Sequence, residues 1–380
     1  MKSKRVLLLI PHLGVGGTEI QTLNLARALI IAGHQVTTLC LYRCIPHMVE
    51  AFEKAGSKVI CVSPAYNRYD VPISYHKRIR LVAFLYKVLK AVLSKEKFDV
   101  VHVQYMTPMA TAILVLRYLI GYRNIIVTSH TNADIYKSLF LLHFIQRYAV
   151  KVFTCITLKA EKGFFDYSIL YEKMMNLSKH NHFTIYNALP YNMKFSNKQQ
   201  REQPKVIGVV SRLEPIKGMD LVVPAFAEVK KHHPEAKLIV VGDGTQLELM
   251  KQQAEMLRVM DSIEWAGRQP QERLHKWYSK MDIVLMPSRS EGFGLTAIEA
   301  MASGCVVVAS NTGGLPEVVS DGKVGLLHEP ESQDSLAERT IRLLNDRELL
   351  ITMKQNAIDH VARFSFAHYS ELINNLYSKL

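Results

Sequence analysis

Short runs of apolar residues alternate with helix-length stretches along the whole chain. Each run has about three to seven residues, which is too short for a buried helix and typical of a strand buried on both faces of a parallel sheet. Alternating strands and helices predict an α/β fold with two doubly wound, Rossmann-like domains. The predicted strands are 6–10, 35–41, 58–62, 100–103, 125–129, 151–156, 183–186, 205–211, 237–242, 263–265, 283–286, 306–309 and 325–327.

A polar stretch divides the two sets of strands. Residues 191–204 are rich in Asn and Gln and contain no apolar run, so they are predicted to form a linker, with a hinge near residues 187–190. A length of 380 residues fits two domains of about 190 residues each better than one core. The predicted domains are 1–190 and 191–362.

The stretch 287–304 is the most informative part of the sequence. It follows a predicted strand and contains a predicted helix that runs from Leu295 to Ser303 and ends at Gly304. Gly292 and Gly294 therefore lie in a strand-to-helix turn. Free backbone amides and the positive end of the helix dipole make such a turn suitable for an anion such as phosphate.

Two glutamates flank this turn. Glu291 lies at its mouth, and Glu299 lies about one helical turn further in, where its carboxylate can accept two hydrogen bonds from a vicinal diol such as a ribose. Phosphate, ribose and a further polar group together indicate a sugar nucleotide. Taken by themselves, the two glutamates are equally well explained as a solvated loop residue and a residue on a helix surface.

Two cations follow the first strand of the second half. Arg212 and Lys217 are five residues apart across a proline turn, so both are expected at one strand end. Departure of a nucleoside diphosphate develops negative charge that such cations stabilise. The alternative is that each is a solvated surface charge. The next two strands end at Gly242, in a tight turn, and close to Arg268.

Two loops of the first half also follow strands. The first contains Gly16 and Gly17, whose small size lets backbone amides meet an anion, although a dinucleotide fingerprint would require glycine in place of Glu19. A simple turn is the alternative. His130 ends another strand, where a side chain can face a ligand. His102 lies inside an apolar strand and is predicted to be a hydrogen-bonded core residue.

The stretch 287–304 closely resembles the paired-glutamate signature of the retaining glycosyltransferases of family 4, also called group 1. These enzymes use the GT-B fold, in which two Rossmann-like domains with parallel sheets face an interdomain cleft. The resemblance covers nearly the whole chain. The run 209–218 matches the family motif almost residue for residue, and the glycine loop and His130 also match. The run 311–317 matches as a loop that shapes the cleft, with simple chain reversal as the alternative.

The resemblance implies a role for each matched residue. Glu291 is expected to hold the hydroxyls of the donor sugar, Glu299 the ribose and His130 the far side of the sugar, while Arg212 and Lys217 stabilise the leaving phosphate. The implied catalytic residues are His130, Arg212, Lys217 and Glu291, and the implied donor-binding residues are Gly16, Gly17, Gly242, Arg268, Gly292, Phe293, Gly294, Leu295 and Glu299.

The resemblance also extends to the end of the chain. Residues 363–380 read as a short break and an amphipathic helix, and in this family such a helix crosses back onto the amino-terminal domain. Two stretches depart from the family pattern. Residues 187–190 read Asn-Ala-Leu-Pro where many members have Asn-Gly-Val-Asp, which puts the hinge geometry in question, and 134–179 gives no sharp match.

Composition indicates a soluble globular protein with reduced thiols. The chain is 48% hydrophobic and 21% charged, and its apolar runs are far shorter than the roughly 20 residues of a membrane span. The apolar run at 6–10 is too short for the core of a signal peptide, so the sequence predicts a cytoplasmic protein. Its five cysteines are odd in number and lack metal-ligand spacing, which predicts reduced, mainly buried thiols.

The positive charge is confined to the first half. Residues 1–190 have 24 Lys and Arg against 10 Asp and Glu, a net of +14, whereas residues 191–380 have 23 against 24, a net of −1. Much of the excess lies in 75–95, where apolar residues recur at helical spacing between cations. Two interpretations remain: a helix lying on an anionic bilayer, or a helix packed on its own sheet with a basic outer face. Nucleic acid is not expected, because no recognition module accompanies the basic stretch.

These features predict a retaining glycosyltransferase that moves a sugar from a nucleoside diphosphate sugar, with uridine as the commonest base of the family, to an acceptor hydroxyl. A lipid-linked acceptor at the inner membrane surface fits the basic first half. No cofactor is expected, and the absence of an Asp-x-Asp triplet agrees with a metal-independent site. Three alternatives remain: a sugar-nucleotide epimerase, a phosphorylase, and a non-catalytic nucleotide-sugar binding protein.

Overall fold

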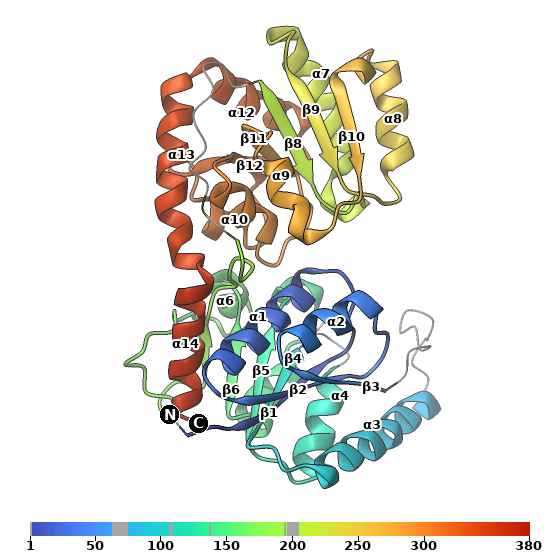
Figure 1. The fold of residues 1–380 in the computed structure, drawn as a ribbon, viewed down its shortest axis with the longest axis vertical. Helices are drawn as coiled ribbons and strands as arrows, with labels where there is room; N and C mark the ends of the chain where they lie inside the picture. Colours follow the sequence, from blue (N-terminus) through green and yellow to red (C-terminus); the bar gives the residue numbers. More distant parts are fainter. Residues whose placement is uncertain (1, 63–74, 106–108, 137, 194, 196–204) are drawn as a thin grey trace. The chain divides into compact units, whose positions relative to one another are not determined.

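The computed structural model describes residues 2–62, 75–105, 109–136, 138–193, 195 and 205–380 (Figure 1). The chain divides into two compact units. Unit 1 comprises residues 1–191 together with 366–380, and unit 2 comprises residues 192–365. The predicted linker falls at this division, but its residues 194 and 196–204 lie outside the described residues.

Unit 1 is built on a seven-stranded parallel sheet in the order β3-β2-β1-β4-β5-β6-β7. The order reverses between β1 and β4, which is the topology of a doubly wound domain. All seven predicted strands are present, with ends that differ by at most two residues. They are β1 (Arg5–Ile10), β2 (Gln35–Cys40), β3 (Lys58–Cys61), β4 (Val100–Tyr105), β5 (Ile125–Ser129), β6 (Val152–Cys155) and β7 (His182–Thr184).

Helices cover both faces of this sheet. On one face α1, α2 and the carboxyl-terminal helix α14 enclose one apolar core, and on the other face α3 to α6 enclose a second core. The π-helical turns η2 (Val115–Leu119) and η4 (Ile145–Ala149) extend α4 and α5. The helices are α1 (Gly17–Ile31), α2 (Pro46–Lys54), α3 (Tyr75–Lys95), α4 (Met109–Leu114), α5 (Phe140–Phe144), α6 (Leu158–Phe165) and α14 (Phe366–Ser378).

Helix α14 belongs to unit 1 although it ends the chain. It packs against α1, and its side chains Ile373, Leu376 and Tyr377 are buried in the core between them. The hydroxyl of Tyr377 is 2.9 Å from Nδ1 of His102, inside the sheet. These contacts fix the last helix on the first domain.

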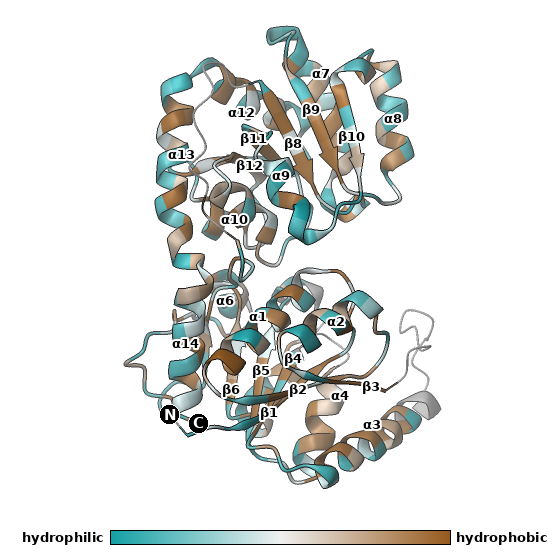
Figure 2. Ribbon diagram, viewed as in Figure 1, coloured by the Kyte–Doolittle hydropathy of each residue, from teal (hydrophilic) through white to brown (hydrophobic). Residues whose placement is uncertain are grey.

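Helix α3 uses its apolar face within unit 1. Leu85 and Leu89 are completely buried against the sheet, whereas Lys87 and Lys90 are exposed. Figure 2 shows apolar and polar residues alternating along this helix. The structure therefore favours the second interpretation of this segment, a helix packed on its own sheet with a basic outer face.

The unusual hinge sequence is held by buried amides of α1. Gln21 donates a hydrogen bond to the carbonyl of Ala188 and accepts one from its backbone amide, at 2.6 and 2.9 Å. Asn24 donates to the carbonyls of Ala188 and Leu189 at 3.3 and 3.2 Å. The chain that leads out of unit 1 is thus fixed by side chains up to residue 189.

Unit 2 is built on a six-stranded parallel sheet in the order β10-β9-β8-β11-β12-β13, and all six predicted strands are present. Ser332 and Asp346 cap two of its helices by accepting backbone N–H groups. The strands are β8 (Val206–Val210), β9 (Lys237–Val241), β10 (Ile263–Gly267), β11 (Ile283–Met286), β12 (Val306–Ser310) and β13 (Gly325–His328). The helices are α7 (Val222–His232), α8 (Leu247–Met256), α9 (Leu274–Tyr278), α10 (Leu295–Ala302), α11 (Leu315–Val319), α12 (Gln333–Asn345) and α13 (Arg347–Val361).

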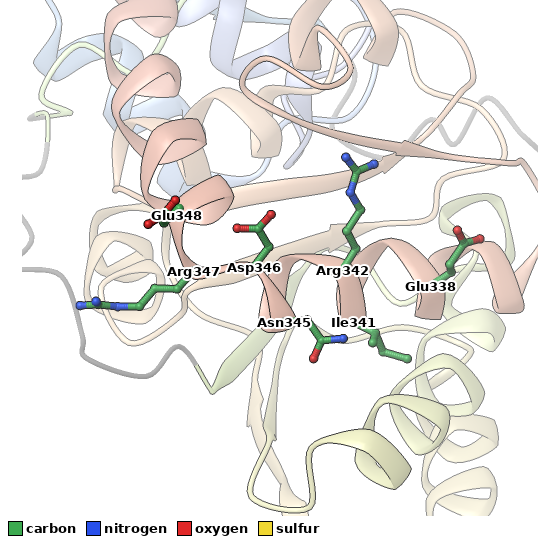
Figure 3. Close-up of a pocket in the computed structure, with 7 residues that line it drawn as sticks. All are labelled: Glu338, Ile341, Arg342, Asn345, Asp346, Arg347 and Glu348. Atoms are coloured by element: carbon green, nitrogen blue, oxygen red, sulfur yellow. The ribbon is translucent and has the colours of Figure 1, made fainter.

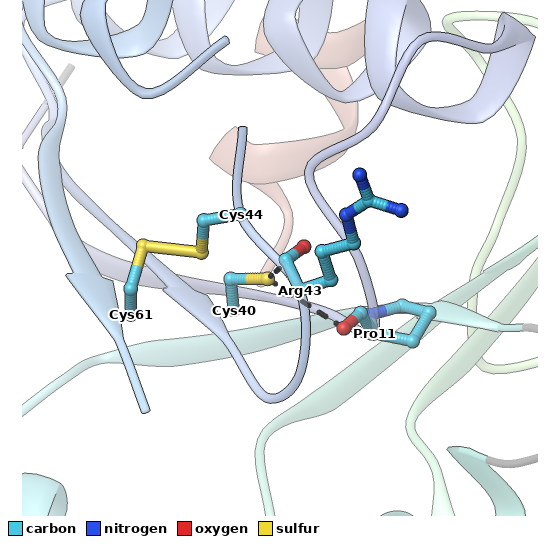
Figure 4. The surroundings of a disulfide bond; sticks show 5 residues. All are labelled: Pro11, Cys40, Arg43, Cys44 and Cys61. Atoms are coloured by element: carbon cyan, nitrogen blue, oxygen red, sulfur yellow. Dashed lines mark hydrogen bonds between the residues drawn. A yellow bond between two sulfur atoms is a disulfide. The ribbon is translucent and has the colours of Figure 1, made fainter. Parts of the chain in front are cut away.

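The expectation of five reduced thiols is wrong for one pair. Cys44 and Cys61 form a disulfide, with their Cα atoms 6.5 Å apart (Figure 4). Parallel pairing of β2 with β3 places Cys61 opposite Cys40, so the segment just after β2 lies close to the end of β3. Spacing along the chain did not reveal this contact. The other three cysteines, Cys40, Cys155 and Cys305, form no disulfide and are buried as expected.

No helix among the described residues is long and apolar enough to cross a membrane.

Candidate functional site

The predicted residues of the second half gather at one edge of the unit 2 sheet. Parallel strands end at the same edge, and the loops after β8, β9, β10 and β11 contain Lys217, Gly242, Arg268 and Glu291 respectively. Open α/β sheets bind ligands at this edge. The edge of the unit 2 sheet is therefore the candidate functional site.

Lys217 and Glu291 form an ion pair at its centre. The Nζ atom of Lys217 donates to Oε2 of Glu291 at 2.6 Å, and the two side chains are only 18% and 16% exposed. Ser288 donates to the same carboxylate oxygen at 3.3 Å. Seventy-four residues separate the two charged side chains in the sequence, so only the fold brings them together.

A close backbone contact and an arginine hold the Lys217 loop in place. Gly218 adopts a φ of +65°, and a Cβ at this position would lie 2.0 Å from the carbonyl oxygen of Pro287. Arg289, in the Glu291 loop, makes a bidentate ion pair with Asp220 at 2.7 and 2.8 Å and donates to the carbonyl of Pro215. Sequence reasoning missed Arg289. Its acidic partners lie far along the chain, and no local spacing reveals them.

The loop 311–317 positions the backbone of Glu291. Gly314 donates its amide to the carbonyl of Glu291 at 3.0 Å. Gly313 adopts a φ of +54°, and a Cβ there would lie 1.9 Å from the same carbonyl oxygen. Of the two roles considered for this loop, chain reversal and shaping of the site, these contacts support the second. The loop acts through Glu291.

The strand-to-helix turn has the expected geometry. Gly294, with a φ of +102°, precedes helix α10, whose first turn begins at Leu295. The first backbone amides of a helix have no intrahelical acceptor and point outward. Phe293 differs from its neighbours, because its side chain is 2% exposed and packs edge-on against Phe364 at 5.5 Å. Any contact of Phe293 with a ligand is therefore through its backbone.

Glu299 is buried and hydrogen-bonded on both carboxylate oxygens. Gln271 donates to Oε1 at 2.7 Å, and the hydroxyl of Tyr278 donates to Oε2 at 3.0 Å. Burial raises the pKa of Glu299 to about 7. The two hydrogen bonds act in the opposite direction, but their effect is smaller than that of burial. Glu299 is thus not a surface residue. Gln271 and Tyr278 were not predicted, because they come from the segment after β10 and meet Glu299 only in the folded unit.

Gly242 has a packing role at the same edge. Its φ is +145°, and a Cβ would lie 1.8 Å from the carbonyl oxygen of Ser211. The tight turn at Gly242 therefore supports the backbone of the loop that contains Arg212. Arg212 and Arg268 are both exposed. These two cations therefore lie at the protein surface, whereas Lys217 lies in a largely buried ion pair with Glu291.

The glycine loop of unit 1 is covered by its own helix. Gly16 precedes α1, and a Cβ there would lie 2.7 Å from Oε2 of Glu19. The carboxylate of Glu19 therefore lies over the loop at the amino terminus of α1, where a negative charge is stabilised by the helix dipole. This is the position where the sequence predicted an anion.

His130 and His102, the two histidines considered from the sequence, each make side-chain hydrogen bonds in unit 1. His130 Nε2 is 2.7 Å from Oε1 of Gln104, and burial lowers the pKa of His130 to about 4. His102 contacts Tyr377 through Nδ1 and Thr128 through Nε2, the latter at 2.7 Å, and burial lowers its pKa to about 3. The prediction that His102 is a hydrogen-bonded core residue is confirmed. Both histidines and Gln104 line a small cavity.

A second hollow lies elsewhere on unit 2. It has a volume of about 740 Å³ and is lined by the end of α12 and the start of α13 (Figure 3). Figure 3 shows cationic and anionic side chains side by side along it. None of the predicted site residues lines this hollow. Within the described ranges, no group of three or more His, Cys, Asp or Glu side chains is placed to hold a metal ion.

Comparison with known proteins identifies the family of each half of the chain. Residues 15–162 match the family described as Glycosyltransferase Family 4, and residues 192–360 match the family described as Glycosyl transferases group 1. The D-inositol 3-phosphate glycosyltransferase of Corynebacterium jeikeium is 38% identical over 183 residues, which are 46% of this chain and 44% of the relative. The enzyme of the same name from Corynebacterium efficiens is 34% identical over 201 residues, 50% of this chain and 47% of the relative. These matches thus span less than half of each relative.

Solved structures resemble the whole chain. HepE from Anabaena, in complex with UDP-glucose, superimposes with a TM-score of 0.78 at 20% identity, over 99% of this chain and 100% of HepE. A likeness at this identity establishes the fold. Since the two matched families together cover most of the chain, the protein belongs to the GT-B glycosyltransferases, with a family 4 domain followed by a group 1 domain.

Proposed function

We propose that this protein transfers a sugar from a nucleoside diphosphate sugar to an acceptor hydroxyl, with retention of the anomeric configuration and without a metal ion. The observation that supports it best is the arrangement in unit 2. The Lys217–Glu291 ion pair, the amino terminus of α10 and the buried carboxylate of Glu299 follow one another at a single sheet edge. Each has the chemistry to recognise one part of such a donor.

The donor parts match these groups in order. The ribose diol donates to the carboxylate of Glu299, the diphosphate accepts from Lys217 and from the first amides of α10, and the sugar hydroxyls donate to Glu291. An ammonium has three N–H groups, so Lys217 can contact a phosphate while it pairs with Glu291. We propose uridine as the base, because HepE, which shares the fold, is solved with UDP and with UDP-glucose.

The proposed chemistry is a front-side displacement. The acceptor oxygen forms a bond to the anomeric carbon on the face from which the bond to the diphosphate oxygen breaks. The departing diphosphate takes the proton of the acceptor hydroxyl. Lys217 and Arg212 stabilise the charge that develops on the phosphate, and fixed charges of this kind act on the transition state more than on the ground state.

His130 is proposed to contact the donor sugar from unit 1. Because burial lowers its pKa to about 4, its imidazole is neutral near pH 7. A neutral imidazole exchanges hydrogen bonds with sugar hydroxyls without adding a charge near the anomeric carbon. We do not assign a proton-transfer role to it.

The proposed acceptor is a lipid-linked saccharide or glycolipid precursor at the inner face of the cell membrane. The net charge of +14 over residues 1–190 supports contact with anionic lipids. The relatives named above act, by their name, on D-inositol 3-phosphate, a soluble polyol phosphate. An acceptor of that class is the second candidate.

Ligand-dependent thermal unfolding tests the donor site directly. The wild type and Glu299→Ala are scanned with UDP, GDP, ADP and their glucose derivatives. A ligand at one hundred times its Kd adds about 2.7 kcal/mol of stability. We expect one base to stabilise the wild type and the variant to lose that shift. Glu248→Ala serves as the matched control, because Glu248 is exposed on α8.

Product analysis then separates the classes of enzyme. A transferase releases nucleoside diphosphate only when an acceptor is present, an epimerase converts the donor without an acceptor, and a phosphorylase requires free phosphate. Two results would contradict the proposed donor site. Either no nucleotide raises the unfolding temperature of the wild type, or a nucleotide raises that of the wild type and of Glu299→Ala equally. If a donor binds but is not turned over with either class of acceptor, the result favours a non-catalytic nucleotide-sugar binding protein.

A further inference from the structure

Six large apolar side chains are exposed together on one side of unit 1. Phe140 is 78% exposed and Leu119 54%, and the others range from 37% to 53%. Isolated exposed apolar residues are common on soluble proteins, but a contiguous group marks an interaction surface. We call this group the aromatic patch: Tyr118, Leu119, Phe140, Leu141, Phe144 and Tyr148.

The aromatic patch is contiguous across two helices. Phe140, Phe144 and Tyr148 recur every four residues, which places them along one side of α5 and η4. The rings of Phe144 and Tyr148 lie 5.3 Å apart. The ring of Tyr118, at the end of the neighbouring helix, lies 6.0 Å from that of Phe144.

The two helices that carry the aromatic patch have an unusual local geometry. Both helices end in a π-helical turn, η2 and η4, closed by backbone hydrogen bonds from Ile120 to Val115 and from Val150 to Ile145. A π turn shifts the following side chains relative to a regular helix and often marks a functional site. Arg117 donates from Nε to the carbonyl of Tyr148 at 3.3 Å and so ties the two turns together.

The helical segments that form the aromatic patch carry positive charge. Residues 109–119 and 140–149 include two arginines, Arg117 and Arg147, and no Asp or Glu. Arg147 is exposed and lies over the ring of Tyr148, at 5.6 Å from its centroid. Helix α3, on which Lys87 and Lys90 are exposed, packs against α4 and η2.

Charge complementarity identifies the partner. A second copy of this surface would bring arginines against arginines, which costs free energy. An anionic bilayer instead offers phosphates to the arginines and an interfacial zone in which aromatic rings are favoured. Exposed aromatic residues mixed with Arg and Lys are typical of surfaces that lie in a membrane interface.

We infer that unit 1 docks on an anionic lipid bilayer through the aromatic patch, with Phe140, Phe144 and Tyr148 in the headgroup region and Arg117 and Arg147 at the lipid phosphates. The apolar face of α3, which the sequence suggested for this role, is buried in the core and is not the inserting surface. The inference deepens the proposed membrane location, but it does not depend on the donor site or on the chemistry of transfer.

Tryptophan fluorescence tests the contact. The chain has two tryptophans, Trp265 and Trp277, both in unit 2. A tryptophan at Phe140→Trp therefore adds a reporter to unit 1. The probe is a vesicle of phosphatidylcholine with about one third phosphatidylglycerol, with and without bromine on the upper acyl chain. We expect bromolipid to quench the added fluorescence of Phe140→Trp and not that of Met174→Trp, a control at a side chain that is 92% exposed.

Co-sedimentation with the same vesicles tests the energetics. Phe140→Ser with Tyr148→Ser is expected to reduce vesicle binding by about tenfold or more, since each substitution removes apolar surface that the interface covers. Met174→Ser with Met256→Ser, at two other exposed apolar side chains, is the matched control and should bind like the wild type. Vesicles of phosphatidylcholine alone should bind weakly.

Several outcomes overturn the inference. These are equal binding by the patch variant and the wild type, equal losses in patch and control variants, equal binding to neutral and anionic vesicles, and no binding by the wild type. A concentration-dependent dimer that disappears in the patch variant would instead make this surface an interface between copies. The UDP-induced thermal shift is measured in parallel. A patch variant that keeps the shift but loses vesicle binding separates docking from the donor site and from misfolding.

Discussion

The two units share one architecture but place different chemistry at the carboxyl ends of their strands. In unit 2 the edge is charged: Lys217 pairs with Glu291, and Arg289 pairs with Asp220 beside them. In unit 1 the candidate residue at this edge is a neutral one, because His130 is hydrogen-bonded to a glutamine and burial lowers its pKa. Fixed charges suit a diphosphate, whereas a neutral imidazole suits hydroxyls.

The two edges also differ in how they are held. Unit 2 positions its loops by close backbone approaches that only glycine permits, at Gly218, Gly242 and Gly313. Unit 1 instead uses side-chain contacts there, because Thr128, near the end of β5, hydrogen-bonds His102, which in turn contacts Tyr377 on α14. We expect the glycines at these close approaches to tolerate substitution least, because a Cβ would collide with a backbone oxygen.

The largest expected effect is on the charged edge. Lys217→Ala removes the cation placed for the leaving diphosphate and should lower kcat by about 10²- to 10³-fold, the usual effect of losing one such group. Initial rates with saturating donor measure it. Lys251→Ala, at a surface ion pair on α8, is the control and should leave kcat unchanged. A loss below threefold in Lys217→Ala would mean that this lysine does not act on the leaving group.

The close approach of Gly313 to the backbone of Glu291 should give the next largest effect when it is disturbed. In Gly313→Ala a Cβ would meet the carbonyl oxygen of Glu291 at 1.9 Å, so we expect a loss of about 2–4 kcal/mol in the free energy of unfolding. Gly322→Ala has a similar φ of +73° but open space, so it should lose only about 1 kcal/mol from backbone strain. Urea unfolding compares the two. Equal losses would show that the close approach is unimportant.

Glu299 should make stability depend on pH. Its pKa is raised from 4.5 to about 7 in the folded protein, so the folded state binds the proton more tightly than the unfolded state. Its contribution to stability is therefore fully present below about pH 4.5 and is lost as the pH rises through 7. We expect the wild type to lose roughly 2–3 kcal/mol relative to Glu299→Gln between pH 5 and 8. If the difference in unfolding free energy between the wild type and Glu299→Gln is the same at pH 5 and at pH 8, the pKa of Glu299 is not raised by burial.

Removing the disulfide, which lies in unit 1, should have a smaller effect on the free energy of unfolding. Replacing Cys44 and Cys61 by serine opens a loop of 17 residues and should lower the stability of unit 1 by about 2 kcal/mol. Dithiothreitol should lower the unfolding midpoint of the wild type and leave that of the double variant unchanged. A wild type insensitive to the reductant would contradict the bond.

The smallest expected effect concerns the neutral network. Tyr377→Phe leaves Nδ1 of the buried His102 without its partner and should destabilise unit 1 by about 1 kcal/mol. Tyr118→Phe removes an exposed hydroxyl and should have no measurable effect on unfolding. If the two variants are equally stable, the contact of α14 with the sheet rests on apolar packing alone.

Much of the fold could be read from local pattern. Every strand of both sheets was predicted within two residues at each end, because strands buried on both faces are continuous apolar runs. The turn before α10 was also predictable, since the spacing of Gly292, Gly294 and the apolar helix residues is local. The inner face of α3 was not assigned uniquely, because helical spacing alone does not say whether a sheet or a bilayer covers it.

The partners of the site residues were not predictable in the same way. Arg289 meets Asp220, Glu299 meets Gln271 and Tyr278, and Gly313 meets Glu291 across separations that no window of sequence spans. The disulfide depended on the pairing of β2 with β3. The sequence thus determined the strands, the helices and the types of chemically active residues, because these follow from local periodicity. Which of those residues touch, and which apolar side chains stay exposed, was decided only by the tertiary structure, because packing joins elements that are distant along the chain.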